Sequence, residues 1–358
     1  MGLAFAGCFL GAGYVSGQEL WQFFGSFGIK GAAGLLLAVA LLLFAGVVMI
    51  LLGRITGLKE IDKLVVRRNV PVLRGAVMLL ELLFLFGVGT IMSAGIGALL
   101  NQLFGLAPFI GSAVFIALVA LVSLAGFSGM VSAFSATVPI LSVVTLVFGI
   151  MSVCENGAVL PEAAGGSNPL MSSWAVAAVS FACYNVFGSI AMIAPLGPYI
   201  KSKKAAVGGI AVGACVLLLI AGSVLVSVSA APEAASAELP MLALAQSRGT
   251  VWGYVYGVLL LLAMFGTALS SLVAFVSMLS AKSGRISRRR KPFTALCAVC
   301  MFLGSLFGFG DLIGVVYPIF GYCSSVFIVC LLVHAAQTRK KEYKFFENSG
   351  TKEEEISS

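Results

Sequence analysis

The sequence predicts an all-α membrane protein with ten transmembrane helices. Its 358 residues are 60% hydrophobic and 10% charged, with a mean hydropathy of +1.09. A soluble domain of this size cannot bury that much apolar surface, whereas a bundle of membrane helices faces lipid with it. Apolar runs long enough to cross a bilayer follow one another along the chain, separated by short polar segments that hold most of the basic residues.

The apolar runs define the expected helices, each with boundaries accurate to a few residues. The first five lie at about 1–24, 31–53, 74–104, 109–126 and 128–153. The second five lie at about 173–200, 205–230, 251–281, 293–308 and 311–336. The basic loop after the second helix is expected to carry a short amphipathic helix. Residues 1–337 therefore form one transmembrane domain, and the polar residues 338–358 are expected to be a disordered tail.

The Lys and Arg residues predict the orientation of these helices. With the N-terminus inside, six basic residues follow the second helix, three the sixth and six the eighth, and five lie in the tail. Only Lys30 and Arg248 then lie outside. Cytoplasmic loops carry an excess of Lys and Arg, so both termini are predicted to be cytoplasmic. Because topology accounts for the net charge of +8, no nucleic-acid partner is expected.

One stretch of the first helix, GAGYVSGQE from Gly11 to Glu19, is unusual for a membrane span. Each of its glycines costs a helix about 1 kcal/mol relative to alanine, and a carboxylate at bilayer depth costs about 3 kcal/mol more. Such a stretch is typical of a helix that unwinds to line a cavity. Close packing against a neighbouring helix is the alternative. Packing explains the glycines but not Gln18 and Glu19 beside them.

The ten helices also divide into two groups of five with matching irregularities. The sixth helix is expected to be interrupted around Tyr184–Ser189, as the first is at its glycines, and the third and eighth helices are both long. Because five is odd, the second group enters the membrane from the opposite side. We therefore expect inverted repeats, at about 1–153 and 173–337, with the binding site of a secondary transporter at the two interrupted helices.

The motif GAGYVSGQE, the ten helices and the total length resemble the YkvI-like membrane proteins of bacteria. This family is a branch of the amino acid–polyamine–organocation superfamily, with the leucine-transporter (LeuT) fold. The resemblance covers the chain up to the tail. It implies a multi-pass protein in the lipid bilayer of the bacterial plasma membrane, with broken first and sixth helices. One departure is that only ten residues precede the glycines; a start upstream of Met1 would account for it.

The resemblance also implies a substrate site at the two breaks. Unwinding at Gly11–Gly13 frees amide N–H groups at the positive end of a half-helix, which suits a substrate carboxylate. Gly188 is the expected counterpart in the sixth helix, where Tyr184 and Asn185 would reach the substrate. The expected substrate-binding residues are Gly11, Ala12, Gly13, Ser16, Glu19, Thr90, Ser93, Tyr184, Asn185, Phe187 and Gly188.

Several of these residues have alternative interpretations. Glu19 is expected to bind a substrate amine, carry a proton or gate the outer vestibule, and the alternative is a structural hydrogen bond to another helix. Phe187 is either an apolar lid or a core residue, since the chain has 26 Phe. Thr90 and Ser93 are either substrate contacts or hydrogen-bonded to their own helix.

The eighth helix contains the sequence FGTALSS, in which Thr267, Ser270 and Ser271 match a sodium site of LeuT-fold transporters. The carbonyls of Gly7 and Leu10 would complete this site, and Na⁺ is the only cofactor or coupling ion expected. The alternative interpretation is that the serines bond back to their own helix. Proton coupling is the rival mechanism, but the Lys that serves it in related permeases has no counterpart in the uncharged fifth helix.

The resemblance and the two breaks favour a secondary transporter of a small amino acid or amine. A receptor that keeps the transporter fold is the second possibility. An enzyme finds no support, since the chain has one His, no H-E-x-x-H motif and no acidic cluster for a metal. The sequence does not name the substrate, the direction of transport or the oligomeric state.

Overall fold

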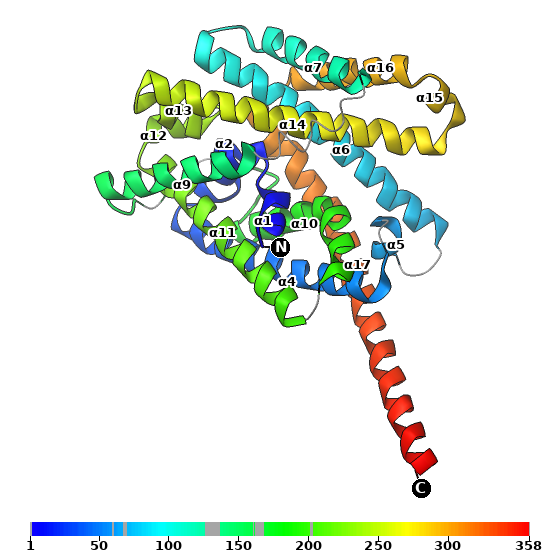
Figure 1. Ribbon diagram of the computed structural model, residues 1–358. Helices are drawn as coiled ribbons and strands as arrows, with labels where there is room; N and C mark the ends of the chain where they lie inside the picture. Colours follow the sequence, from blue (N-terminus) through cyan, green and yellow to red (C-terminus); the bar gives the residue numbers. More distant parts are fainter. Residues whose placement is uncertain are drawn as a thin grey trace.

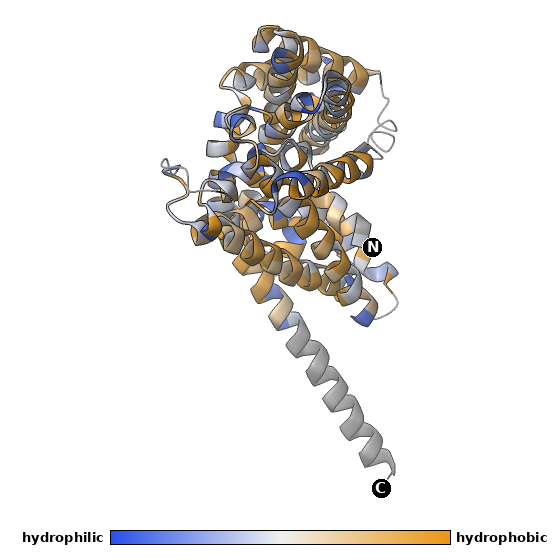
Figure 2. Ribbon diagram, turned by 90° about the vertical axis from the view of Figure 1, so that its left-hand side faces the viewer, coloured by the Kyte–Doolittle hydropathy of each residue, from blue (hydrophilic) through white to orange (hydrophobic). Residues whose placement is uncertain are grey.

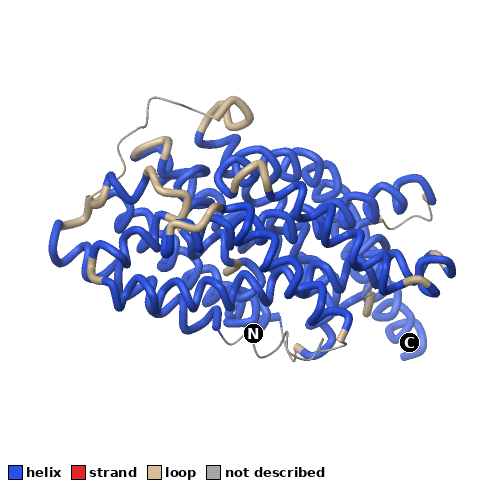
Figure 3. Tube along the Cα trace, turned by 90° about the horizontal axis from the view of Figure 1, so that it is seen from above, coloured by secondary structure: helices blue, strands red, loops and turns tan. Residues whose placement is uncertain are grey.

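A computed structural model of the chain describes residues 2–58, 61–66, 70–125, 137–159, 161, 168–200 and 203–357. These residues form helices and loops without a β-strand (Figure 3). Among them, six helices are long and apolar enough to cross a membrane. They are α4 (Ile29–Thr56), α6 (Pro71–Phe104), α9 (Thr137–Asn156), α11 (Lys203–Ser229), α14 (Thr250–Lys282) and α17 (Phe309–Ser357).

The other expected helices appear as shorter segments. These are α7 (Pro108–Leu124), α10 (Trp174–Ile193), α16 (Arg290–Ser305) and the interrupted segment at the N-terminus. The start of the expected fifth helix, at residues 128–136, lies outside the described residues. The number of ten membrane crossings therefore stays a prediction, although each expected apolar run contains a helix in the described part.

The first segment consists of four short pieces: α1 (Gly2–Phe9), α2 (Ala12–Ser16), α3 (Gln18–Leu20) and the π-helical η1 (Trp21–Gly25). Gly11, between α1 and α2, has an extended backbone with φ −79° and ψ 171°. Gly17, between α2 and α3, is left-handed with φ +88°. A side chain at that φ would be strained, so glycine is the residue that permits the second break. The chain thus leaves helical geometry twice within the GAGYVSGQE stretch.

The expected interruption of the sixth helix at Tyr184–Ser189 is wrong. Helix α10 is continuous through these residues and ends at Ile193, where the 3₁₀ helix η2 (Ala194–Tyr199) begins. Pro195 and Pro198 lack the N–H that an α-helix would use, so the helix changes type there. The irregularity therefore lies one to two turns after the predicted position.

The described helices form two groups that Figure 1 shows one above the other. Helices α6, α7, α14 and α16 pack together in the upper group, and α1, α4, α10 and α11 pack together in the lower group. Helix α17 contacts both α10 and α6, and α9 contacts both α11 and α14, so these two helices join the groups. Helices α6 and α14, which occupy corresponding positions in the two expected repeats, pack against each other.

Hydrophobic residues make up most of the helices, as Figure 2 shows. Large hydrophobic side chains such as Leu36, Val114, Leu219 and Val258 are more than half exposed. In water each exposed apolar Å² costs about 25 cal/mol, so a surface of this kind requires lipid around it. The composition therefore predicts the environment of the helices correctly.

Short helices connect several of the longer ones in the described part of the chain, among them α15 (Gly284–Arg288) after α14. The expected amphipathic helix is α5 (Ile61–Val65), whose Leu64 carbonyl lies 2.7 Å from Nδ1 of His334 on α17. The sequence did not predict α12 (Pro232–Ala235) and α13 (Pro240–Ser247), which follow α11. Helix α13 packs on the second break of the N-terminal segment, because a Cβ on Gly17 would lie 3.0 Å from Cγ of Met241.

Helix α17 continues through the residues of the expected tail and ends at Ser357. Figure 1 shows this part of α17 extending away from the other helices. Residues 338–358 contain no Pro and one Gly, and they are rich in Lys and Glu, which favour helix. The expected disorder of this segment stays a prediction.

Topology is tested by single cysteines in a variant whose eight native cysteines are replaced. We expect an impermeant maleimide added to intact cells to label Lys30→Cys and Glu233→Cys but not Arg288→Cys. All three positions are exposed, but only the first two lie on the side that the basic residues predict to be external. Permeabilised cells provide the control for reactivity. Labelling of Arg288→Cys from outside would contradict the inverted-repeat arrangement.

Candidate functional site

The carboxylate of Glu19 is the buried acidic group around which the candidate site is built. Glu19 is the second residue of α3, two positions after the left-handed Gly17, and is 6% exposed. The hydroxyl of Tyr184, on α10, donates a hydrogen bond to Oε1 of Glu19. A buried carboxylate is stable only where donors satisfy its oxygens. This contact therefore ties α3 to the middle of α10.

The second oxygen of the carboxylate faces the backbone of α2. A Cβ placed on Gly13 would lie 2.6 Å from Oε2 of Glu19 and 3.8 Å from the hydroxyl of Tyr317. Only a residue without a side chain allows this approach. The Gly13 carbonyl is occupied by the hydroxyl of Ser16, which donates to it over 2.8 Å.

Aromatic rings surround the carboxylate. The Tyr184 ring stacks on that of Tyr317, with centroids 4.8 Å apart and planes 15° apart. Phe23 and Phe181 contact Tyr184 with centroid separations of 5.8 Å and 5.6 Å. The faces of such rings attract cations, so an ammonium group beside Glu19 would find both a carboxylate and π-faces.

Amide side chains of α3 and η1 face the beginning of α17. Nε2 of Gln22 donates to the carbonyl of Gly310 over 2.9 Å. A Cβ on Gly310 would lie 2.9 Å from Nε2 of Gln18, and one on Gly314 would lie 2.9 Å from Oε1 of Gln22. The Oε1 atoms of both glutamines are buried without a hydrogen-bond partner among the described residues. Because Gly310 and Gly314 have no side chains, the amide side chains of Gln18 and Gln22 can lie directly against α17.

Two tyrosines anchor α2 to its neighbours. The hydroxyl of Tyr14 donates to the carbonyl of Leu217 on α11 over 2.8 Å. The hydroxyl of Tyr256 on α14 donates to the carbonyl of Val15 over 2.7 Å, and it also lies 2.8 Å from Oγ1 of Thr145 on α9. The bond from Tyr256 satisfies the Val15 carbonyl near the second break. Together these bonds hold α2 against α11, α14 and α9.

The structure brings together Gly13, Ser16, Glu19 and Tyr184 from the residues expected to bind substrate. Asn185 follows Tyr184 and donates to the carbonyl of Phe181 over 3.0 Å. Gly11 and Ala12 lie at the start of α2, where the amide of Gly11 donates to the Phe9 carbonyl over 2.7 Å.

The structure does not place the remaining expected residues around Glu19. Thr90 donates to the carbonyl of Phe86 one turn earlier, and Ser93 exchanges hydrogen bonds with Ser112 on α7. Phe187 is buried, and its ring packs against that of Phe327. A Cβ on Gly188 would lie 2.8 Å from the Phe84 ring, which makes this glycine a packing contact between α10 and α6.

The five residues expected to bind sodium lie on two separate elements. On α14, Thr267 donates to the Ala263 carbonyl and Ser270 to the Thr267 carbonyl, each over 2.9 Å, and Ser271 is buried. On the α1 side, Gly7 is exposed, and the amide of Leu10 donates to the Ala6 carbonyl over 3.0 Å. Thr267 and Ser270 thus bond to their own helix, as the alternative interpretation expects.

Sequence reasoning missed Tyr317, Gln22, Gly310 and Gly314. Gly310 and Gly314 are four residues apart on one helix, and that spacing of small residues is a known signal for close helix packing. It would have identified the face of α17 that meets α3. No local signal identifies Tyr317, because its contact with Tyr184 joins helices far apart in the sequence.

The fold is that of the LeuT-type secondary transporters. The chain is similar to Mhp1 in its inward-facing conformation, with a TM-score of 0.58 and 17% identity over 92% of this chain and 74% of that chain. It is also similar to a mutant of the manganese transporter of Eremococcus coleocola, with a TM-score of 0.60 and 16% identity over 93% of this chain and 77% of that chain.

The expected resemblance to the YkvI-like membrane proteins is confirmed. The chain is 24% identical over 344 residues to the uncharacterized membrane protein YkvI of Bacillus subtilis, covering 95% of this chain and 96% of that protein. It is also 24% identical over 351 residues to the protein YyaD of the same organism, covering 95% and 97%. No protein-family model matches the chain.

The geometry at Gly13 is tested by a pair of glycine substitutions. Gly13→Ala should push the Glu19 carboxylate away from Tyr184, because the new Cβ would lie 2.6 Å from Oε2. Gly11→Ala is the matched control, since its Cβ would meet nothing within 4 Å. We expect Gly13→Ala to lower the thermal stability of the purified protein and Gly11→Ala to leave it nearly unchanged. Equal effects of the two substitutions would contradict this geometry.

Proposed function

We propose that this protein is a secondary active transporter of a small amino acid or amine that works by alternating access. The observation that carries the proposal is the buried Glu19 carboxylate, which lies after a helix break and meets Tyr184 and Gly13. An acidic group inside a membrane protein is retained for function more often than for packing. The similar solved structures, Mhp1 and a manganese transporter, support the same class.

Glu19, Gly13, Tyr184 and Tyr317 lie together and are called the Glu19 group below. The chemistry of this group favours an amine-bearing substrate. The carboxylate would form an ion pair with an ammonium group that replaces the hydroxyl of Tyr184 as its partner. The stacked rings of Tyr184 and Tyr317 would add cation–π attraction. A substrate carboxylate would meet the first amides of α2, at Ala12 and Gly13, which follow the break at Gly11.

The two ends of the N-terminal segment are covered to different extents. Met241 and Pro240 of α13 pack on Gly17, which covers the Glu19 group on the side that the basic residues predict to be external. At the other end, Gly7 of α1 is exposed, and a Cβ on Gly11 would meet nothing within 4 Å. In this proposal, movement of α1 at the first break opens and closes the cytoplasmic access.

The coupling ion in this proposal is sodium, and a proton is the alternative. Tyr256 of α14 bonds to Val15, and Thr267 lies eleven residues further along α14, about 16 Å at 1.5 Å per residue. Closure of α1 would bring the carbonyls of Gly7 and Leu10 toward this part of α14. Hard oxygens from backbone and hydroxyl groups suit Na⁺, and helix breaks supply them in transporters.

Transport is tested by uptake into proteoliposomes. We expect wild-type protein to accumulate labelled amino acid or amine, and Glu19→Gln to reduce the initial rate by about 10- to 100-fold, the loss of one charged hydrogen-bonded contact. The substitution keeps the size of the side chain and a hydrogen-bonding group. Uptake equal to the wild type between pH 5 and 8 would contradict the role of Glu19. Binding without any uptake would favour the receptor.

Sodium coupling is tested by the double substitution Ser270→Ala with Ser271→Ala. We expect it to remove the stimulation of uptake by a sodium gradient, because the two hydroxyl oxygens are lost from the ion site. Ser325→Ala is the control, since Ser325 bonds back to the Tyr322 carbonyl on an exposed face of α17. Sodium-independent uptake driven by a pH gradient in the wild type would refute the site and favour Glu19 as the proton carrier.

A further inference from the structure

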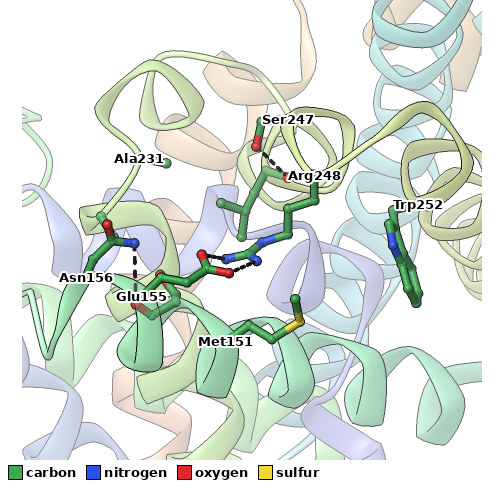
Figure 4. A pocket seen from close by; sticks show the side chains of 10 residues that line it. Met151, Glu155, Asn156, Ala231, Ser247, Arg248 and Trp252 are labelled. Carbon is green, nitrogen blue, oxygen red and sulfur yellow. Dashed lines mark hydrogen bonds and ion pairs between the residues drawn. The ribbon is translucent and has the colours of Figure 1, made fainter.

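A polar cavity lies away from the Glu19 group, at the ends of α9 and α11 and between α13 and α14 (Figure 4). Its volume is about 470 Å³, within the range of small-molecule sites. The basic residues predict this side of the membrane to be external. Its polar lining includes Ser152, Glu155, Asn156 and Arg248, and its apolar lining includes Met151 and Trp252.

Arg248 and Glu155 form an ion pair that leaves part of the guanidinium unused. Nη1 and Nη2 of Arg248 donate to the two carboxylate oxygens of Glu155, each over 2.9 Å, as Figure 4 shows. The guanidinium also lies over the Phe148 ring, 5.9 Å from its centroid. Nε of Arg248 is buried and has no hydrogen-bond partner among the described residues. The Nε–H group therefore has no acceptor from the described part of the protein, although Arg248 lines the cavity.

The hydroxyl of Ser152, which also lines this cavity, is a second buried donor without an acceptor among the described residues. The Ser152 side chain is 1% exposed. Several other serines on the described helices donate to a carbonyl of their own helix, as Ser229 does to Leu225. Buried donors without partners are rare, and each one points to an acceptor that the protein itself does not supply. Two such donors on one cavity point to a ligand with an anionic or carbonyl oxygen.

Charge balance narrows the chemistry of that ligand. Glu155 already neutralises Arg248, so a multiply charged anion such as free phosphate would leave the cavity with an uncompensated negative charge. The Glu155 carboxylate is about half exposed and can accept further hydrogen bonds. A molecule with one carboxylate and one ammonium group matches both halves of the ion pair.

We propose that this cavity is a second site that binds a zwitterionic amino acid. The ligand carboxylate accepts hydrogen bonds from Nε of Arg248 and the hydroxyl of Ser152, and its ammonium group faces Glu155. The apolar side chains of Met151 and Trp252 contact the remainder of the molecule. This site goes beyond the proposed transport function, because binding here needs neither the Glu19 group nor a conformational cycle.

The test is equilibrium binding of a tritiated mixture of L-amino acids to purified protein in phosphatidylcholine nanodiscs. The Gly13→Leu variant blocks the Glu19 group, so it isolates the second cavity. We expect Gly13→Leu to retain one bound amino acid per protein, and addition of Ser152→Ala to weaken that binding about tenfold. The thermal stability of Ser152→Ala should not fall, because the lost hydroxyl has no partner. Ser229→Ala is the matched control and should leave binding unchanged.

A further variant and a lipid comparison complete the test. Arg248→Gln in the Gly13→Leu background should abolish binding, and nanodiscs containing phosphatidylserine should give the same affinity as phosphatidylcholine alone. Loss of binding in phosphatidylserine would assign the cavity to a lipid headgroup and overturn the proposal. Absence of binding to Gly13→Leu, with one amino acid bound to the wild type, would also overturn it and leave the proposed transport function intact.

Discussion

The burial of the Glu19 carboxylate imposes conditions on several helices at once. A charged or neutral carboxyl group away from water must have its oxygens satisfied, and an unsatisfied buried polar group costs about 1–3 kcal/mol. Here Tyr184 of α10 satisfies one oxygen, while the other lies against the backbone of α2 at Gly13. The positions of α2, α3 and α10 are therefore interdependent, and a change in any one of them alters the surroundings of the carboxylate.

The surrounding structure meets these conditions through glycines and tyrosines. Gly17 adopts the left-handed conformation that turns α3 toward α10. Tyr14 and Tyr256 satisfy carbonyls and fix α2 against its neighbours, whereas α1 lies beyond the first break and lacks these anchors. Helix α1 is held by apolar packing against α11 and α10 instead, with Phe5 and Phe9 buried. In the proposed function, a hinge at the first break would move α1 relative to α2, and the buried carboxylate would lie next to that hinge.

The sequence predicted the helices well because the bilayer fixes the length and polarity of each span. It also located the N-terminal break, since glycines and a carboxylate in an apolar helix have few alternative explanations. It failed at Gly188, where one glycine permits close packing against Phe84 instead of unwinding the helix. It also missed Tyr317 and helix α13, because their positions depend on contacts between distant segments. Local sequence patterns predict where helices lie. Which residues of distant helices meet at the site depends on how the helices pack.

The proposed function requires that a ligand exchanges hydrogen bonds with the Glu19 carboxyl group. Ligand-induced infrared difference spectroscopy of the purified protein measures this directly, because carboxyl stretching bands shift when their hydrogen-bond partners change. Addition of a bound amino acid or amine should produce a carboxyl difference band in the wild type that is absent from Glu19→Gln. An identical difference spectrum in the two proteins, at equal ligand occupancy, would contradict the account.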